Sequence, residues 1–486
     1  MKLNQLIASL NLTKVKGNVD CEITALEFDS RRVAPGQLFF ALKGEAADGH
    51  DFISDVVAKG AVAVVCERLP ASCDEKVCYI QVPDSHYAMG HIAAGFYGHP
   101  SKQLTLVGVT GTNGKTTTVT LLYRLFRALG YKVGLLSTVV NYVDDKMVKA
   151  ERTTPDALQI QRLMAEMVEA GCTYCFMEVS SHAVVQHRIA GLEFDGALFS
   201  NITHDHLDYH KTFEAYIKAK KLFFDTLPAS SFALINLDDR NGRTMVQNTK
   251  AKVKTYSLHT LADFHCRIIE NTFEGMQLNI DGVEVWTRFT GRFNAYNMLL
   301  VYATARLLGV DKNETLRLLS SMEPVSGRFE VVRGQHSITA IIDYAHTPDA
   351  LQNVIDTIND IRNDEQRLIA VVGCGGNRDK TKRPVMARIA AAGSDKVVFT
   401  SDNPRNEDPN AILDDMYAGL SAEALARAIR IADRREAINT AIHLSRPGDI
   451  ILIAGKGHET YQEVKGIQTH FDDKEVFLCC ITCLNI

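Results

Sequence analysis

The stretch Thr105-Leu-Val-Gly-Val-Thr-Gly-Thr-Asn-Gly-Lys-Thr-Thr-Thr118 passes from an apolar, β-prone run into a glycine-rich loop. A helical pattern follows it, and the apolar face of that expected helix consists of Val119, Leu122, Leu125, Phe126 and Leu129. Strand, glycine loop and helix in this order are the setting of a phosphate-binding loop, where backbone N–H groups and the helix N-terminus surround phosphate oxygens. The stretch therefore predicts a nucleotide-binding sheet.

Each polar residue of this loop has an expected role. Lys115 would reach the β- and γ-phosphates of a nucleotide, and the Thr116 hydroxyl would ligate Mg²⁺. The match to the general pattern is incomplete, because Val109 stands where the first glycine is expected, and an ordinary βα turn is the alternative. The residues expected to bind the ATP phosphates are Gly111, Thr112, Asn113, Gly114, Lys115, Thr116 and Thr117.

Length and composition limit the remaining possibilities. The chain has 486 residues, and at roughly 150 residues per domain we expect three domains, over residues 1–100, 101–331 and 332–486. The net charge of −5 gives no reason to expect nucleic acid as a partner, and no apolar run approaches the roughly 18 residues of a membrane span. Eleven scattered cysteines, with no signal-type apolar segment at the N-terminus, predict a cytoplasmic protein with reduced thiols.

Polar groups follow several expected strands. Glu178 ends an apolar strand, which is where nucleotide-binding sheets hold a Mg²⁺-binding acid. The next strand ends in a run with three histidines, His204, His206 and His210, for which we expect a metal site rather than a solvated turn. Between them and the phosphate loop, Thr153-Thr-Pro-Asp156 predicts a helix with a threonine cap.

The third unit alternates strands and helices, and its strands end in polar loops at residues 375–380, 402–405 and 455–459. Repeated βα units predict a mostly parallel sheet whose site lies at the carboxyl ends of the strands.

Seven motifs, in order along the chain, resemble those of the Mur ligase family, the ATP-dependent amide-forming ligases of bacterial cell-wall synthesis. The motifs are Gly111-Thr-Asn-Gly-Lys-Thr116, Glu178-Val-Ser-Ser-His182, Asp205-His-Leu-Asp208, Gly291-Arg-Phe-Asn-Ala-Tyr-Asn297, Ser326-Gly-Arg328, Asp343-Tyr-Ala-His346 and Gly455-Lys-Gly-His458. The resemblance implies an α/β fold of three domains: a small N-terminal α/β domain, a central P-loop domain with a parallel sheet, and a Rossmann-like C-terminal domain.

The resemblance also implies a reaction. Within the family, the loop Asp402-Asn-Pro-Arg405 is similar to that of the members that add meso-diaminopimelate to UDP-N-acetylmuramoyl-L-alanyl-D-glutamate. ATP would convert the D-glutamate γ-carboxylate into an acyl phosphate, which the amine then attacks. The residues implied to be catalytic are Lys115, Glu178, His206 and Lys220.

Two magnesium ions are implied as well. One Mg²⁺ would lie on Thr116 and Glu178, and a second near His206 would be held by Lys220, carbamylated by CO₂ into an anionic oxygen donor. Lys220 is at the matching place, twelve residues after Asp208, so its neighbours Lys218 and Lys221 are interpreted as surface lysines.

Three sets of binding residues follow from the same resemblance. ATP's base and ribose would be bound by Asn297, Arg328 and Asp343. The UDP-linked substrate would contact Phe28, Ser30, Glu45, Ala46 and Ala47 in the first domain, and Thr153, Thr154, Ser180, Gln186 and Arg188 at its peptide end. meso-Diaminopimelate would contact Arg378, Asp402, Asn403, Pro404, Arg405, Gly455 and Glu459, because guanidinium groups pair with carboxylates and acids with ammonium groups.

Three alternatives stay open. A lysine-adding ligase of the same family would not need Arg405, because the end of lysine has no carboxylate. A folylpolyglutamate synthase-like ligase shares the nucleotide fold but not the long first domain. A non-catalytic nucleotide-gated module would need neither the second-metal residues nor the third-domain loops.

We expect a monomer that acts on small molecules and closes its third domain on the second to exclude water.

Overall fold

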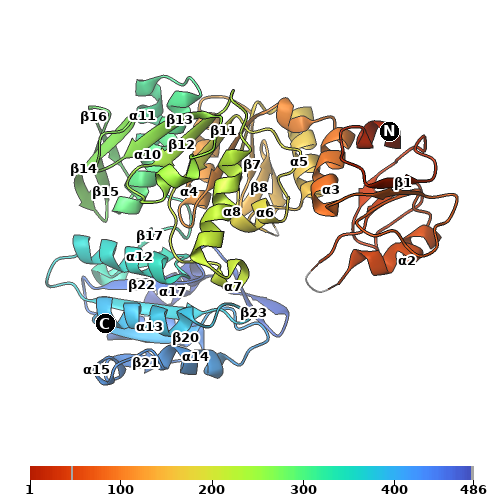
Figure 1. Cartoon of the computed structure of the whole chain (residues 1–486). Coiled ribbons are helices and arrows are strands. Elements are labelled where there is room, and N and C mark those ends of the chain that lie inside the picture. Colours follow the sequence, from red (N-terminus) through yellow and green to blue (C-terminus); the bar gives the residue numbers. More distant parts are fainter. Residues whose placement is uncertain (45–46, 151, 483–486) are drawn as a thin grey trace.

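The structure, a computed structural model, describes residues 1–44, 47–150 and 152–482, which form three lobes with a sheet in each (Figure 1). In the first lobe the strand order is β1-β5-β4-β3-β2, and only β1 runs antiparallel to its neighbour. Its strands are β1 (Lys14–Lys16), β2 (Leu26–Glu27), β3 (Leu38–Phe40), β4 (Ala63–Cys66) and β5 (Cys78–Gln81). Its α-helices are α1 (Leu3–Ile7), α2 (Ile53–Ala58) and α3 (Ser85–Phe96).

The central lobe contains an eleven-stranded sheet in the order β16-β15-β14-β13-β12-β11-β6-β10-β7-β8-β9. The run from β14 to β7 is parallel, and antiparallel strands complete both ends of the sheet. The strands are β6 (Thr105–Thr110), β7 (Val133–Leu136), β8 (Val140–Val143), β9 (Lys146–Lys149), β10 (Tyr174–Glu178), β11 (Gly196–Phe199), β12 (Phe232–Asn236), β13 (Lys252–Ser257), β14 (Phe264–Thr272), β15 (Gly275–Ile280) and β16 (Val283–Thr287).

Helices cover both faces of this sheet (Figure 1). They are α4 (Lys115–Ala128), α5 (Ala157–Glu169), α6 (Ser181–Val185), α7 (Leu207–His210), α8 (Phe213–Asp225), α9 (Gly242–Met245), α10 (Arg292–Leu307) and α11 (Lys312–Ser320). Because side chains alternate along a strand, Leu106 packs into the core that includes α5 and α8, whereas Val107 packs into the core that includes α4 and α10. The central strand β6 is thus buried on both faces, and its carboxyl end carries the glycine loop.

The third lobe has a six-stranded sheet in the order β17-β18-β22-β19-β20-β21, and only β17 is antiparallel. The strands are β17 (Glu330–Arg333), β18 (Thr339–Asp343), β19 (Leu368–Cys374), β20 (Lys396–Ser401), β21 (Ala428–Arg430) and β22 (Ile450–Ala454), followed by the hairpin β23 (Tyr461–Val464) and β24 (Ile467–His470). The helices are α12 (Pro348–Ile361), α13 (Lys382–Gly393), α14 (Pro409–Tyr417), α15 (Ala422–Leu425), α16 (Arg434–Leu444) and α17 (Asp473–Thr482).

The predicted fold class is confirmed, and two local predictions need correction. Strand β17 begins at Glu330 and pairs with β18, so the third sheet starts before the boundary predicted between residues 331 and 332. The cap of α5 is Asp156, whose side chain accepts a hydrogen bond from the Gln159 N–H, and the predicted threonine cap is wrong. Thr154 instead directs its hydroxyl at the backbone of β10.

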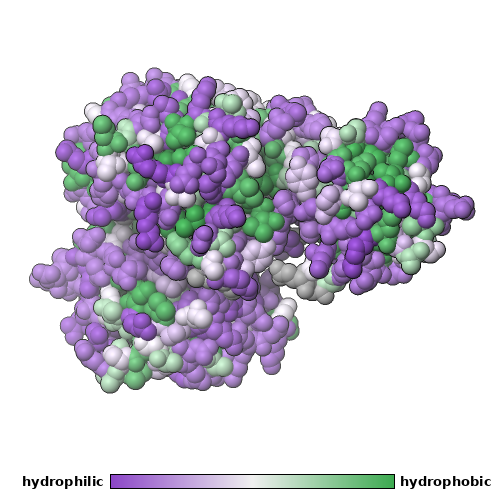
Figure 2. Space-filling model, in the orientation of Figure 1, coloured by the Kyte–Doolittle hydropathy of each residue, from purple (hydrophilic) through white to green (hydrophobic). Residues whose placement is uncertain are grey.

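The surface in Figure 2 is mainly hydrophilic, with apolar residues in separate patches. Within residues 1–44, 47–150 and 152–482, no helix combines the length and the apolar composition needed to cross a membrane.

Candidate active site

The phosphate loop has the predicted geometry, with β6 ending at Thr110 and α4 beginning at Lys115. Two of its glycines have no room for a side chain. A Cβ at Gly111 would lie 1.9 Å from the Ser200 hydroxyl, and one at Gly114, where φ is +86°, would lie 2.4 Å from Asn297 Oδ1. The loop therefore fits closely between the end of β11 and the start of α10.

Lys115 is buried and folds back onto its own loop. Its ammonium donates to the carbonyls of Gly111 and Thr112, at 2.9 Å each. Burial lowers the pKa of Lys115, so a bound anion, which the end of the helix dipole also favours, would stabilise the charged form of the lysine.

Thr116 and Glu178 lie together beside this loop. The Thr116 hydroxyl donates to a Glu178 carboxylate oxygen at 2.9 Å. Thr138 donates to the same carboxylate through its backbone N–H at 2.8 Å and its hydroxyl at 3.2 Å. Hydroxyl and carboxylate oxygens are the donors that Mg²⁺ prefers, so this pair fits the predicted first metal position.

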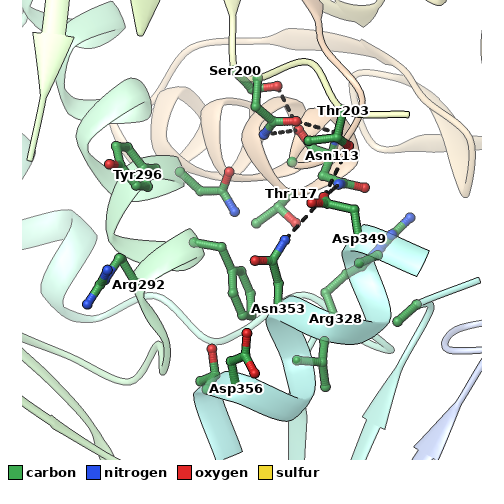
Figure 3. A pocket seen from close by; sticks show the side chains of 18 of the residues that line it. Asn113, Thr117, Ser200, Thr203, Arg292, Tyr296, Arg328, Asp349, Asn353 and Asp356 are labelled. Atoms are coloured by element: carbon green, nitrogen blue, oxygen red, sulfur yellow. Dashed lines mark hydrogen bonds between the residues drawn. The ribbon is translucent and has the colours of Figure 1, made fainter. Parts of the chain in front are cut away.

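A cavity of about 720 Å³ opens next to the loop, between the central and third lobes (Figure 3). The central lobe contributes Asn113, Tyr296 and Asn297 to the lining of the cavity. The side toward the third lobe is lined by Arg328 and Asp343. Arg328 donates to the Thr116 hydroxyl at 3.2 Å, and its Nε is buried without a hydrogen-bond partner. An unsatisfied guanidinium N–H beside a phosphate loop suits a nucleotide phosphate. Burial raises the pKa of Asp343 to about 6.

Asp349, in the first turn of α12, links the third lobe to the phosphate loop. Its carboxylate accepts hydrogen bonds from the Asn113 amide at 2.8 Å and the Thr203 hydroxyl at 3.1 Å (Figure 3). Asn353 donates to the same oxygen at 3.2 Å. Closure of the third domain on the second, as predicted from the sequence, requires hydrogen bonds between the two lobes such as these.

Asp349→Ala is expected to lower kcat roughly 10-fold with little change in melting temperature, because a hydrogen bond to a charged group contributes about 1.5 kcal/mol or more. Asp414→Ala is the matched control, since Asp414 is an exposed carboxylate on α14 of the same lobe that pairs with Arg430 and is not among the residues lining this cavity. Steady-state kinetics and thermal melts of both variants test this, and equal kcat in the two would contradict a role in closure.

Lys220 is fully enclosed beneath the phosphate loop. Its amine donates to the Gly111 carbonyl at 2.7 Å and lies 4.7 Å from the centre of the Tyr216 ring. Burial, with the neighbouring charge of Lys115, puts the pKa of Lys220 well below its ordinary value. By contrast, Lys218 is exposed, as expected of a surface lysine, whereas the side chain of Lys221 is only 11% exposed and pairs with Asp225.

Two of the three histidines after β11, His206 and His210, pack against the same rings, those of His182 and Tyr216. His204 stacks on Phe213, with ring centres 4.7 Å apart, and His210 Nε2 lies 2.9 Å from the Ser181 hydroxyl. His206 packs against the ring of His182 at 4.8 Å, and burial lowers its pKa to about 4. Among the side chains that the structure describes, no three His, Cys, Asp or Glu residues could hold a metal together, so a site built on the three imidazoles is not found.

The residues predicted for the peptide end of the substrate form one network beside Glu178. The Thr154 hydroxyl donates to the Glu178 carbonyl at 2.8 Å and accepts from the Ser180 N–H at 3.1 Å. Arg188 donates to the Thr154 carbonyl at 2.8 Å and to Gln186 at 2.6 and 3.0 Å. Thr153 adjoins the network in sequence and is half-buried.

The predicted uridine contacts lie in the first lobe, outside this network. Phe28 is exposed, and the Ser30 carbonyl accepts a hydrogen bond from Lys59. The Ala47 carbonyl accepts from the Gly44 N–H. Glu45 and Ala46 lie outside the described residues.

Five residues at the ends of β20 and β22 form a group that we call the strand-end cluster: Asp402, Asn403, Arg405, Lys456 and Glu459. Asn403 donates to Glu459 at 2.8 Å and accepts from the Lys456 ammonium at 3.1 Å. That ammonium lies 3.4 Å from Glu459 and 3.7 Å from Asp402. Gly455 must be glycine here, because its φ is +115° and a Cβ would lie 3.0 Å from Asp402 Oδ2.

Lys456 was not predicted, although it lies inside a quoted motif. Only its burial, with 0% of the residue exposed, and its three acceptors distinguish it from a surface lysine. Burial and the nearby Asp402 raise the pKa of Glu459. The cluster thus joins two carboxylates with two cations, the buried Lys456 ammonium and the Arg405 guanidinium, so it offers partners both for an ammonium group and for a carboxylate.

Arg405 lies at the edge of the cluster with φ of +52°, and its side chain is 21% exposed. The guanidinium donates to the Gly376 carbonyl at 2.9 Å and lies 3.6 Å from Glu463. Pro404 precedes it and accepts from the Glu407 N–H at 3.0 Å. Arg378 is exposed on the neighbouring loop.

A buried ion pair supports this cluster from behind. Arg434 of α16 donates to both carboxylate oxygens of Asp473 of α17 at 2.7 Å, and neither side chain is exposed to solvent. The same guanidinium donates to the carbonyls of Ser401 at 3.3 Å and Ala454 at 3.0 Å, which directly precede Asp402 and Gly455. It therefore holds together the ends of two strands that carry the cluster.

Comparisons with known proteins agree with this arrangement. The Mur ligase family catalytic domain matches residues 22–97, the Mur ligase middle domain residues 109–305, and the Mur ligase glutamate ligase domain residues 327–457. A curated protein of Cytophaga hutchinsonii, named UDP-N-acetylmuramoyl-L-alanyl-D-glutamate–2,6-diaminopimelate ligase, is 59% identical over 475 residues, which is 98% of each chain. A protein of the same name from Bacteroides fragilis is 55% identical over 476 residues, again 98% of each chain.

A solved structure of a ligase with that name has a TM-score of 0.69, is 31% identical and covers 99% of each chain. Sequence identity of this degree extends along almost the whole chain, and the three family domains match successive parts of it. The chain belongs to the Mur ligase family.

Proposed function

We propose that this chain is an ATP-dependent ligase that joins meso-diaminopimelate to the D-glutamate γ-carboxylate of UDP-N-acetylmuramoyl-L-alanyl-D-glutamate, a step in peptidoglycan precursor synthesis. The observation that carries the proposal is the strand-end cluster, in which a guanidinium, a buried ammonium and two carboxylates lie on the lobe that closes on the phosphate loop. The names of the relatives support it.

The reaction needs a leaving group on the carboxyl carbon. A γ-carboxylate oxygen attacks the γ-phosphorus of ATP, ADP departs, and an acyl phosphate results. The amine of diaminopimelate then attacks the carbonyl carbon, and phosphate leaves as the amide forms. The first step brings two anions together, so Lys115 and Arg328 would stabilise the charge that develops on the transferring phosphoryl group.

Magnesium fits the oxygen donors beside the loop. Thr116 and Glu178 would hold one Mg²⁺, which when bound neutralises phosphate charge. A second ion near His206 would need an anionic donor, which a free lysine amine cannot supply. We propose that Lys220 is carbamylated by CO₂, because burial beneath the phosphate loop lowers the pKa of its amine and so favours the uncharged, nucleophilic form.

The substrate contacts implied by the family resemblance are proposed for this chain as well. Thr153, Thr154, Ser180, Gln186 and Arg188 would bind the peptide end of the nucleotide substrate beside Glu178. Phe28, Ser30 and the segment 45–47 would bind its uridine end, and Asn297, Arg328 and Asp343 would bind ATP. All these groups belong to one chain, which supports a monomer. None of the ten cysteines that the structure describes forms a disulfide, which supports a cytoplasmic location.

The choice of amine is the test of this function. Product mass is measured after incubation with ATP, the UDP-linked dipeptide and equal amounts of diaminopimelate and lysine. We expect the diaminopimelate adduct to predominate. A predominant lysine adduct would identify the lysine-adding alternative, and ATP binding without any product would identify a binding module.

Arg405→Ala is expected to reduce kcat/KM for diaminopimelate by roughly 30-fold or more while leaving the KM for ATP unchanged. Removing one partner of a buried charge pair costs about 2–5 kcal/mol, chiefly because the substrate carboxylate is left unpaired. Lysine lacks that carboxylate, so its kcat/KM should change little.

Arg430→Ala is the matched control, since Arg430 is an ion-paired arginine of the same lobe that lies on β21, away from the cluster. Unchanged selectivity in Arg405→Ala would refute the assignment of Arg405 to the distal carboxylate.

A further inference from the structure

A fully buried guanidinium lies beneath the two loops that follow β19 and β20. Arg383 of α13 donates to both carboxylate oxygens of Glu407, at 2.9 and 3.0 Å, and has 0% exposure. It also donates to Asp415 of α14 at 2.8 Å and to the Gly375 carbonyl at 3.2 Å. A buried charge persists only when it is paired and hydrogen-bonded, so this geometry fixes the position of the Glu407 carboxylate.

The Glu407 carboxylate also binds the neighbouring loop. It accepts from the Asn377 N–H at 2.5 Å and lies 3.3 Å from the Lys380 ammonium. The Glu407 N–H in turn donates to the Pro404 carbonyl at 3.0 Å. Its hydrogen bonds with Arg383 lower the pKa of Glu407 to about 2, so the carboxylate stays ionised at any working pH. One carboxylate therefore ties together loop 375–380, loop 402–407 and helix α13.

The two loops also touch each other directly. The Gly376 N–H donates to the Asn403 carbonyl at 2.9 Å, and the Asn406 N–H donates to the Asn377 side chain at 3.1 Å. A Cβ at Gly376 would lie 1.9 Å from the Pro404 carbonyl oxygen, so the two loops pack too closely here for any side chain at this position. Any displacement of Glu407 would thus change how the loops face one another.

Arg378 and Arg405 come from these two loops and both pass close to Gly375, and the Arg378 guanidinium donates to the Asn377 carbonyl at 3.1 Å. A Cβ built on Gly375 would lie 3.0 Å from an Arg405 nitrogen and 4.0 Å from Arg378 Cγ. The proposed function assigns Arg405 to the distal carboxylate of the amino acid, and the family resemblance implies that Arg378 contacts the same amino acid. Their separation decides whether both can bind one carboxylate.

We propose that Glu407, clamped by Arg383, is a positioning residue for amino-acid selectivity, because it sets the separation of Arg378 and Arg405. This inference rests on the proposed function, since it assumes a substrate with a distal carboxylate. The carboxylate oxygens of Glu407 are already engaged by the protein, so Glu407 acts through the two arginines. A misplacement of about 1 Å in a binding group can cost on the order of 10²-fold in rate.

The experiment compares kcat/KM for meso-diaminopimelate and for lysine in the wild type, Glu407→Gln and Glu407→Asp. In Glu407→Gln the ratio of the two values should fall roughly 10-fold, with the KM for ATP unchanged. Glu407→Asp keeps the charge but is one methylene shorter, so it should fold more readily and show a smaller fall in the same direction.

Asp415→Asn is the matched control. It removes another acidic partner of Arg383, which lies on α14 and on neither loop, so the melting temperature should fall while the selectivity ratio stays at the wild-type value.

An unchanged ratio in either folded Glu407 variant would overturn the inference. So would an equal loss with both amino acids, which would indicate a purely structural role. Failure of the proposed function would be visible separately, since the wild type itself would then not prefer diaminopimelate.

Discussion

Lys220→Ala is expected to be folded and nearly inactive, with kcat reduced by roughly 10²-fold or more. The enclosed amine lies against the Gly111 carbonyl under the phosphate loop, where only an anionic derivative could help to bind a second cation. A bound metal contributes several kcal/mol of charge stabilisation in reactions of this kind, so its loss should abolish most turnover. Because alanine removes a desolvated amine and no ion-pair partner, the melting temperature should change little.

Added formate should restore part of the activity of Lys220→Ala, because a small carboxylate can supply the missing oxygen donor. Lys218→Ala and Lys221→Ala are the controls on the same helix, and both should remain close to the wild type with no response to formate. Labelled bicarbonate should give a carbamate signal in the wild type and none in Lys220→Ala. Normal turnover of Lys220→Ala would refute the carbamate proposal.

Lys115→Ala should lose at least roughly 10²-fold in kcat/KM, the typical result of removing one preorganised charge from a transition state. In the absence of a nucleotide, Lys115 donates to the carbonyls of its own loop, so part of its hydrogen bonding must be exchanged when phosphate binds. The charge of the lysine, rather than a newly formed contact, is what the variant removes. Kinetics and ATP titrations by calorimetry measure the effect.

Lys132→Ala is the control for that variant. Lys132 also donates to a backbone carbonyl, that of Ala170, but it precedes β7 at the opposite end of the sheet from the phosphate loop. Its activity should equal that of the wild type. A folded Lys115→Ala protein with wild-type kinetics would remove the phosphate loop from the mechanism.

Local patterns predicted the parts of the site that depend on neighbouring residues. The glycine loop, Lys115 and the acid Glu178 could be found because a strand, a turn and a helix start are consecutive in sequence. The cap of α5 was misassigned to threonine because both threonine and aspartate cap helices, and the competing bond of Thr154 to Glu178 lies 24 residues away.

Contacts between distant segments were not predictable in this way. Asp349 bonds Asn113 across 236 residues, and no spacing rule connects them. Arg383 and Lys456 look like ordinary surface cations in the sequence, and only burial beneath strand ends reveals their partners. The three histidines show the opposite error, because closeness in sequence did not bring all three imidazoles together: His204 stacks on Phe213, whereas His206 and His210 pack against His182.

The ion pair between Arg434 and Asp473 has a consequence for the order in which the enzyme is made. Translation delivers the phosphate loop and the peptide-end network hundreds of residues before Asp473, and domains fold as they emerge from the ribosome. Until α17 arrives, Arg434 lacks its carboxylate partner, and the ends of β20 and β22 lack the ion pair that holds them together. The amino-acid site is therefore the last part of the enzyme to become ordered. An incomplete chain that already binds ATP would have no ordered site for the amino acid that attacks the acyl phosphate.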